Sequence, residues 1–279
     1  SIWLARLSVD RWRHALPPEE RAAADRAPTV LITETAHGPR IAAANDAGLA
    51  AGARPGMLLA DARALCPAIT AVPTDPAGDL AALEKLALWA QRWGPWSALD
   101  PADGLLVDVT GAGHLRGGEA RLLADVTAAF AARGLTARAA LAPTAGAAWA
   151  LAHYGPVGAI CDPPRSGEEM LRHLADLPVA ALRLDDDVLT VLRRLGIKRL
   201  GELAGVSGAG GDDPTREAAQ RDALRRRFRN RRSPAANPLL RLDQLLGKVP
   251  EPLLPVAARP MPLVQRRLME PIRHRDLLD

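Results

Sequence analysis

Carboxylates in the first half of the sequence are the side chains whose spacing could support metal chemistry. Asp10 follows the apolar run 2–7, and Asp103 directly precedes the run Gly104-Leu105-Leu106-Val107. If Asp10 and Asp103 followed adjacent strands, they could hold a divalent cation between them. However, Asp100-Pro101-Ala102-Asp103-Gly104 is typical of a turn, and Asp10 could cap the next helix. We therefore favour structural roles for both aspartates.

A dense run of arginines near residue 226 could bind a polyanion. Seven arginines fall within twelve residues, with Asp222 as the single acid and Phe228 as an apolar anchor. Charge runs are usually solvated helix faces. Here the like charges would repel one another at low salt, so we favour contact with phosphates and no readout of base sequence. The arginines are Arg221, Arg225, Arg226, Arg227, Arg229, Arg231 and Arg232.

The segment 195–204 resembles a helix-hairpin-helix turn. Gly196 lies between two short helical patterns, and the basic residues Lys198 and Arg199 follow it. A glycine at this position would let backbone N–H groups approach a phosphate, with added attraction from the two basic side chains. The alternative is an ordinary corner between helices that is closed by a C-cap glycine. Because basic residues surround the segment, we predict contact with a DNA backbone.

The sequence gives little support for a nucleophilic, phosphate-binding or metal-binding motif elsewhere in the chain. The serines lack a G-x-S-x-G setting, the six histidines are scattered, and no glycine-rich phosphate loop follows a strand. Cys66 and Cys161 lack companions at metal-binding spacing, which favours a reducing cytoplasm. Trp89, Trp93 and Trp96 are better explained as core or interface residues than as a stacking face.

Length and charge narrow the function further. The chain has 279 residues, enough for two or three domains, and it contains no uncharged apolar run that could span a membrane. Residues 1–165 hold 15 basic and 16 acidic groups, whereas residues 188–275 hold 19 basic and 8 acidic groups. This one-sided charge predicts nucleic acid as the partner.

The periodicity of the first 165 residues predicts an α/β region. Apolar runs indicate strands, and apolar residues at three- and four-residue spacing indicate helices. We expect strands over 2–7, 29–33, 41–44, 71–73, 104–109, 137–141 and 157–161. We expect helices over 17–25, 46–51, 58–65, 77–92, 118–132 and 144–153.

The pattern changes near residue 165, where we place a domain boundary. Short helices are expected over 167–174, 178–181, 185–195, 199–205 and 215–230, with no strand among them. Five prolines between residues 247 and 262 predict an extended connector. A further strand is expected over 263–272.

At this point the order of the motifs resembles that of the Y-family (UmuC/DinB-like) translesion DNA polymerases. The similarity rests on Ala43-Ala44-Asn45, on Gly52 to Met57, on Ala60 to Pro67, and on the stretch from Ser97 to Thr110. It implies a palm over 1–165 with inserted fingers at about 17–73. It also implies an all-α helix-hairpin-helix thumb over 166–247, and over 248–279 a Pro-rich linker and the start of a little finger.

The catalytic motifs of that family are altered here. Aligning Ser8-Val9-Asp10 with the family's first motif places Ser8 at a metal-binding aspartate, and Gly104 stands where the catalytic glutamate would be. Asp103 alone keeps a ligand position. Asp46 and Leu49 replace the tyrosine and arginine that grip the triphosphate, and residues 153–156 contain no lysine. A two-metal transfer needs several bridging carboxylates, so we predict no metal cofactor and no polymerase activity.

This combination resembles the ImuB-like, catalytically degenerate branch of the family. The resemblance implies a cytoplasmic, non-catalytic DNA-binding adaptor in damage-induced mutagenesis. The implied partners are DNA, an error-prone C-family DNA polymerase, the RecA-like ImuA, and the sliding clamp through a region beyond this chain, with no membrane. Two alternatives remain open: a weakly active lesion-bypass polymerase, which would need Mg²⁺, and a generic module that binds the DNA backbone.

Overall fold

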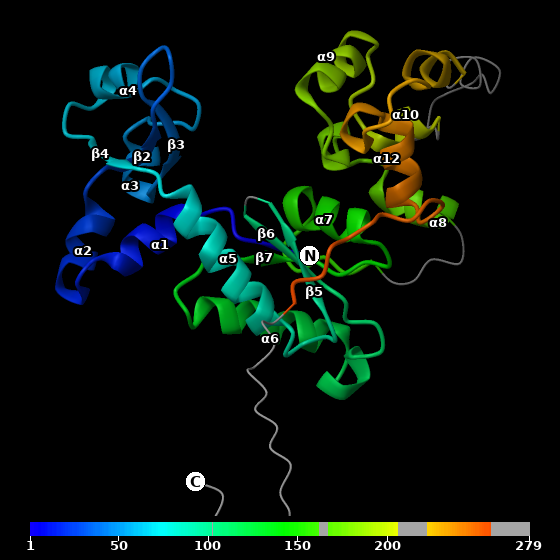
Figure 1. Cartoon of the computed structure of the whole chain (residues 1–279), viewed down its shortest axis with the longest axis horizontal. Coiled ribbons are helices and arrows are strands. Elements are labelled where there is room, and N and C mark those ends of the chain that lie inside the picture. The colour runs from blue at the N-terminus through cyan, green and yellow to red at the C-terminus, as the bar shows by residue number, and fades with distance from the viewer. Residues whose placement is uncertain (102, 162–166, 206–221, 258–279) are drawn as a thin grey trace, which may run out of the picture.

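A four-stranded antiparallel sheet forms the centre of the molecule. The computed structural model describes residues 1–101, 103–161, 167–205 and 222–257. We call this sheet the palm-like sheet, with strand order β5-β6-β1-β7. Figure 1 shows it between a lobe of mixed composition and a helical region. The strands are β1 (Ile2–Trp3), β5 (Ser97–Asp100), β6 (Gly104–Val107) and β7 (Arg138–Ala139).

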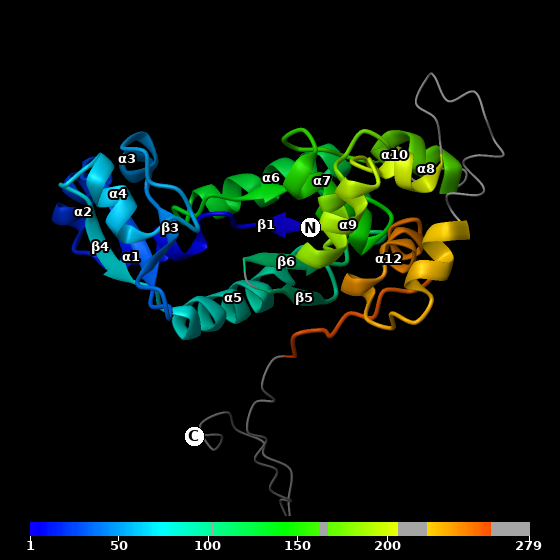
Figure 2. The same ribbon diagram turned by 90° about the horizontal axis from the view of Figure 1, so that it is seen from above.

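Alternation along β1 sends its two side chains into different cores. Ile2 packs with Leu105 and with residues of α5 (Pro76–Ala90) and α6 (Glu119–Ala131). Trp3 packs against the core that contains α7 (Ala145–Tyr154) and the helical region. Successive residues of a strand point to opposite faces, so α5 and α6 cover one face and α7 the other. Figure 2 shows β1 running between these helices.

The lobe at one end, which we call the fingers-like region, is built around a second sheet. Its strand order is β3-β2-β4, with β2 and β4 parallel. The buried Asn45 joins its parts, because its Oδ1 accepts from the backbone N–H groups of Thr29 and Gly48 and its Nδ2 donates to Ala27 O. The elements are α1 (Leu7–Ala15), α2 (Pro18–Arg26), β2 (Thr29–Thr33), β3 (Arg40–Ala44), α3 (Asp46–Ala50), α4 (Leu59–Leu65) and β4 (Thr70–Pro73).

The helical region lies at the other end of the palm-like sheet (Figure 2). One continuous apolar core joins it to α7. Its elements are α8 (Gly167–Leu174), η2 (Val179–Leu182), α9 (Asp186–Arg194), α10 (Leu200–Ala204), a helix over 222–228, η3 (Pro234–Ala236) and α12 (Pro238–Leu245). In the described ranges 167–205 and 222–257, no strand of two or more residues occurs, as predicted.

Several predicted elements need correction. The expected strand over 2–7 ends at Trp3, because Leu4 and Leu7 are buried at helical spacing and α1 begins at Leu7. The expected strand over 157–161 is reduced to one bridge between Leu141 and Ile160. Strand β5 and helices α1 and α12 were not predicted. The strand expected over 263–272 and the first part of the helix expected over 215–230 lie outside the described residues.

The proline-rich connector is extended as far as residue 257, as its prolines predicted. Within the described part of the chain, no helix combines the length and the apolar character that crossing a bilayer would require.

Candidate functional site in the palm-like sheet and the helical region

Asp103 lies in the turn between β5 and β6, at the point where β1 ends. The Leu4 N–H donates to the Asp103 carbonyl at 2.7 Å, and Trp3 Nε1 donates to Asp103 Oδ2 at 2.9 Å. The turn position and the proximity to the end of the first strand agree with the sequence prediction. The residues beside Asp103 at this strand end are therefore Trp3 and Leu4.

Ser8 does not occupy the position that we predicted for it. It lies on α1, and its Oγ donates to Asp79 Oδ2 at 2.5 Å. The predicted motif register is wrong, because the strand that it assumed ends four residues earlier than expected. Asp10 is also on α1 rather than at a strand end, and it accepts the Thr136 N–H at 2.7 Å. It is buried without capping a helix.

Gly104 lies where a larger side chain would collide with Asp100. The two residues are paired across the β5–β6 ladder. A Cβ placed on Gly104 would lie 2.8 Å from Asp100 Oδ2 and 3.0 Å from Asp100 Cβ. Such contacts are shorter than van der Waals packing allows, so a glutamate could enter here only if Asp100 moved.

Five side chains form a continuous stack over this end of the sheet. His153 lies between the rings of Trp3 and Trp149, with centroid distances of 4.3 Å and 3.8 Å. The guanidinium of Arg138 lies 5.8 Å from the centroid of the Trp3 ring, and that of Arg183 lies 5.3 Å from the Trp149 ring. We call these five side chains the aromatic stack. Aromatic and cation–π contacts of this kind hold the rings and guanidinium groups in place.

The aspartates beside the aromatic stack are engaged by it. Asp103 accepts from the Trp3 indole, and Asp100 lies beside Arg183, whose guanidinium lies over the Trp149 ring. Burial raises the pKa of Asp100, and Arg183, 3.9 Å away, partly offsets the effect. Among the described residues, no group of three or more His, Cys, Asp or Glu side chains is arranged to hold a metal ion.

His153 is held in the stack by its backbone contact as well as by its ring. Its Nδ1 lies 2.9 Å from the carbonyl oxygen of Trp149, one helical turn earlier. Burial lowers the pKa of His153, so the neutral imidazole is favoured at neutral pH. The ring therefore fills space between two indoles and is poorly placed to take up a proton.

The aromatic stack was not predicted from the sequence. Trp149 and His153 are four residues apart on α7, so they share one helix face, and this spacing was a usable signal. The contribution of Trp3 depended on the strand–helix boundary that we misplaced. The contribution of Arg183 comes from a distant turn and carries no local signal.

The fingers-like region carries an ion pair where the resemblance placed a triphosphate contact. Arg6, just after β1, pairs with Asp46 at 2.6 Å. Asp46 begins α3, and the Leu49 side chain is exposed on the same helix. The pair joins the segment that follows β1 to the start of α3. The Arg6 guanidinium is thereby engaged by Asp46.

The predicted hairpin turn exists, but its backbone donors are occupied. Gly196 has φ of 78°, which explains the glycine between α9 and α10. The N–H groups of Lys198 and Arg199 both donate to Glu202 Oε2, at 2.6 Å and 3.1 Å. Backbone carbonyls accept from residues 196, 197, 200 and 201. In this structure these N–H groups are thus engaged within the protein, and a DNA contact through Gly196, Lys198 and Arg199 stays a prediction.

The described arginines of the run are exposed, three of them on the helix over 222–228 and three directly after it. Leu224 and Phe228 are the buried residues of this helix. Arg225 is 3.7 Å from Asp222, and Arg231 is 3.9 Å from Asp187, so both are weakly neutralised. The remaining described arginines of the run have no ion pair with another described residue. The exposed members are Arg225, Arg226, Arg227, Arg229, Arg231 and Arg232, and Arg221 lies outside the described residues.

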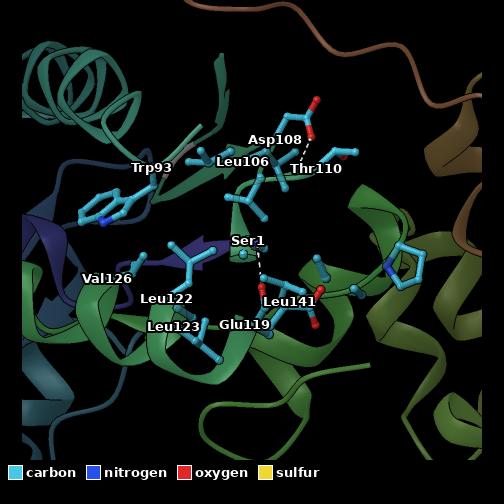
Figure 3. Close-up of a pocket in the computed structure, with 18 of the residues that line it drawn as sticks. Ser1, Trp93, Leu106, Asp108, Thr110, Glu119, Leu122, Leu123, Val126 and Leu141 are labelled. Carbon is cyan, nitrogen blue, oxygen red and sulfur yellow. Dashed lines mark hydrogen bonds between the residues drawn. The ribbon is translucent and has the colours of Figure 1, made fainter. Parts of the chain in front are cut away.

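A cavity of about 800 Å³ lies at the opposite end of the palm-like sheet from Asp103. Figure 3 shows Leu106 facing Leu122 and Leu123 of α6 across it. Its polar rim includes Asp108, which accepts the Thr110 N–H, and Glu119. Because it borders the beginning of β1 and Asp103 borders the end, it is separate from the aromatic stack.

Comparison with known sequences identifies related proteins. The model of the impB/mucB/samB family matches residues 20–153. Protein ImuB from two strains of Caulobacter vibrioides is 45% identical over 202 residues, which are 72% of this chain and 39% of each relative. The chain thus spans about two fifths of the length of these curated relatives.

Solved structures with a similar fold cover most of this chain. DinB from Sulfolobus solfataricus matches with a TM-score of 0.59 and 16% identity, over 90% of this chain and 67% of that chain. An insertion ternary complex of Dbh DNA polymerase matches with a TM-score of 0.63 and 16% identity, over 90% of this chain and 68% of that chain. The predicted fold is confirmed: a mixed α/β structure that resembles the palm and fingers of Y-family polymerases.

Proposed function

The chain carries a domain of the impB/mucB/samB family, and from this premise we propose that it is the polymerase-like part of a non-catalytic, DNA-binding adaptor in translesion synthesis. The proposal has three parts: loss of catalysis in the palm-like sheet, retained binding to the DNA backbone, and recruitment of other proteins. The first two depend on described residues, and the third depends on the relationship to ImuB.

The aromatic stack carries the non-catalytic part of the proposal. Nucleotidyl transfer by two metal ions needs carboxylates that converge on both ions. At the end of β1 stand Trp3 and Leu4, Gly104 has no carboxylate, Asp103 accepts from the Trp3 indole, and Asp100 lies 3.9 Å from Arg183. Placing two ions here would require the stack to open and new ligands to enter. The proposed adaptor therefore uses no metal cofactor; Mg²⁺ would be required only by a residual polymerase.

The arginine run supports the DNA-binding part. Its described arginines are exposed, and the chain has the fold of polymerases solved as ternary complexes. Arginines without strong ion pairs can neutralise phosphates and release counterions on binding. Side chains that contact only phosphates fix position on the duplex without reading its sequence.

The proposed partners follow from the relationship to Protein ImuB. We infer that the full-length protein works in damage-induced mutagenesis with an error-prone C-family DNA polymerase and the RecA-like ImuA. It would reach the sliding clamp through a region outside this chain. The peptide Asp243 to Gly247 superficially resembles a clamp-binding motif, but Gln244, Leu245 and Leu246 are buried in α12 or directly after it. A clamp contact at this segment is therefore not part of the proposal.

Reconstitution of lesion bypass tests the adaptor role. An error-prone C-family polymerase would be assayed on a template with a defined lesion, with and without the full-length protein, ImuA and the clamp. We expect bypass to depend on the full-length protein and to persist in the Asp103→Ala variant, because the adaptor contributes no metal site. Bypass that is unchanged when the protein is omitted, or that is lost in Asp103→Ala, would contradict the proposal.

A further inference from the structure

Four buried charged residues connect three parts of the chain that are distant in sequence. Glu251 Oε1 accepts from Arg183 at 2.6 Å and from Arg241 at 2.9 Å, and Arg183 lies 3.9 Å from Asp100. The four side chains are only 12–16% exposed. We call this set the charge clasp. Asp100 belongs to the palm-like sheet, Arg183 and Arg241 to the helical region, and Glu251 to the connector.

The connector continues from the charge clasp to the edge of the palm-like sheet. Pro255 forms an antiparallel bridge with Ala98 of β5, which is the edge strand. The Val256 N–H donates to Ser97 O at 2.7 Å, and Val256 O accepts from Gln91 Nε2 at 2.9 Å. The Val256 side chain also packs against the core of the sheet. An exposed edge strand is thereby covered.

The charge clasp is tight but incompletely satisfied. Burial lowers the pKa of Arg241 and raises that of Asp100, so each charged form is held at a cost. Glu251 Oε2 and Arg241 Nε are buried and lack a hydrogen-bond partner among the described residues. A buried ion pair contributes modestly to stability when intact, but removal of one partner leaves an uncompensated charge. Glu251 is therefore the carboxylate of the clasp that hydrogen-bonds to both Arg183 and Arg241, while Asp100 lies near Arg183 alone.

From these contacts we propose that residues 249–257 form a releasable strap that Glu251 locks. When the strap is docked, it fixes the helical region against the palm-like sheet and makes the chain beyond residue 257 begin at the β5 edge. When Glu251 leaves Arg183 and Arg241, the strap detaches as a local unit while both cores remain folded. This inference concerns the conformation of the molecule and does not depend on the proposed function.

Hydrogen exchange of the Glu251→Gln variant tests the strap, with Leu254→Ala as the matched control. Leu254 lies in the strap with its side chain 89% exposed, so its removal should change no contact of the clasp. In Glu251→Gln we expect the Val256 amide to exchange at least tenfold faster, while amides in the centres of α6 and α7 stay within twofold of wild type. Leu254→Ala should match wild type throughout.

Two outcomes would overturn the strap. Unchanged exchange at Val256 in Glu251→Gln would show that Glu251 does not hold it. A similar acceleration of Val256 and of the α6 and α7 amides would show that the clasp is part of the global fold and not a local lock. If Glu251→Gln does not fold, Glu251→Asp keeps the charge but shortens the side chain that reaches Arg183 and Arg241, and the same two results then decide.

Discussion

Two aspartates next to the strand end at Trp3 illustrate how a residue's environment determines its chemistry. Asp103 accepts a hydrogen bond from the Trp3 indole, whereas Asp100, at the end of β5, lies 3.9 Å from the guanidinium of Arg183. Gly104 provides the space for Asp100 that a side chain at this position would take. A carboxylate that accepts from a neighbouring indole, as Asp103 does, contributes to the packing of this strand end.

At the residue scale, we predict that Gly104→Ala destabilises the protein by about 1–3 kcal/mol, the usual cost of overpacking a core. The reason is the 2.8 Å approach of the new Cβ to Asp100 Oδ2. Chemical denaturation gives the free energy of unfolding. The same substitution in an Asp100→Gly background should cost clearly less. An equal cost in both backgrounds would show that Asp100 is not the cause.

A second prediction at the residue scale concerns pH. The pKa of His153 is lower in the folded state than its ordinary value of 6.5, so the unfolded chain binds the proton first on acidification. Stability from the neutral imidazole is thus complete above pH 6.5 and decreases as the pH falls below it. Urea midpoints between pH 7.5 and 5 should fall more for wild type than for His153→Phe, which keeps an aromatic ring without a titrating group. Parallel curves for the two proteins would contradict this assignment.

At the scale of elements, the helix over 222–228 exposes Arg225, Arg226 and Arg227 and buries Leu224 and Phe228. Replacing Arg225, Arg226 and Arg227 together by Ala should weaken binding to duplexes of different sequence by similar factors. The slope of log K against log salt should become shallower by about 0.9 for each phosphate that is no longer neutralised. Fluorescence anisotropy at several salt concentrations measures both quantities.

A matched control for this prediction is Arg63→Ala, which removes an exposed arginine from α4 in the fingers-like region. Its affinity and salt slope should equal those of wild type. If the triple variant also keeps both values, the arginine run does not contact DNA.

Elements were predictable where one local pattern decides their structure. The strand at 29–33 and the helix at 167–174 were predicted with their observed bounds, because apolar spacing and flanking turn residues agree there. The first strand was predicted too long, because Leu4 and Leu7 fit both a strand run and a helix face. The hairpin turn was correctly placed, but the side chain that occupies its amides, Glu202, was not considered.

At the scale of the whole molecule, contacts between distant segments could not be derived from one sequence. The aromatic stack combines β1, β7, α7 and the turn after η2, and the charge clasp combines β5, the same turn, α12 and the connector. Neither has a local signature beyond the spacing of Trp149 and His153. The resemblance to Y-family polymerases supplied the global arrangement that local periodicity lacks, and it correctly indicated that Asp103 borders the end of the first strand.

The arrangement of the molecule also links the two unusual features. Arg183 contributes its guanidinium to the stack through Trp149 and to the clasp through Glu251 and Asp100. Its backbone adopts φ of 54°, which is uncommon for a residue other than glycine. The strand end at Asp103 and the connection to the helical region are therefore parts of one packed unit.

The central claim is that the palm-like sheet has exchanged a metal site for the aromatic stack, and primer extension tests it most directly. The full-length protein would be incubated with a primed, undamaged template, deoxynucleotides and either Mg²⁺ or Mn²⁺, beside the Asp103→Ala variant and an active Y-family polymerase as positive control. We predict no extension above background by either wild type or Asp103→Ala. Metal-dependent extension by the wild type that disappears in Asp103→Ala would contradict the account.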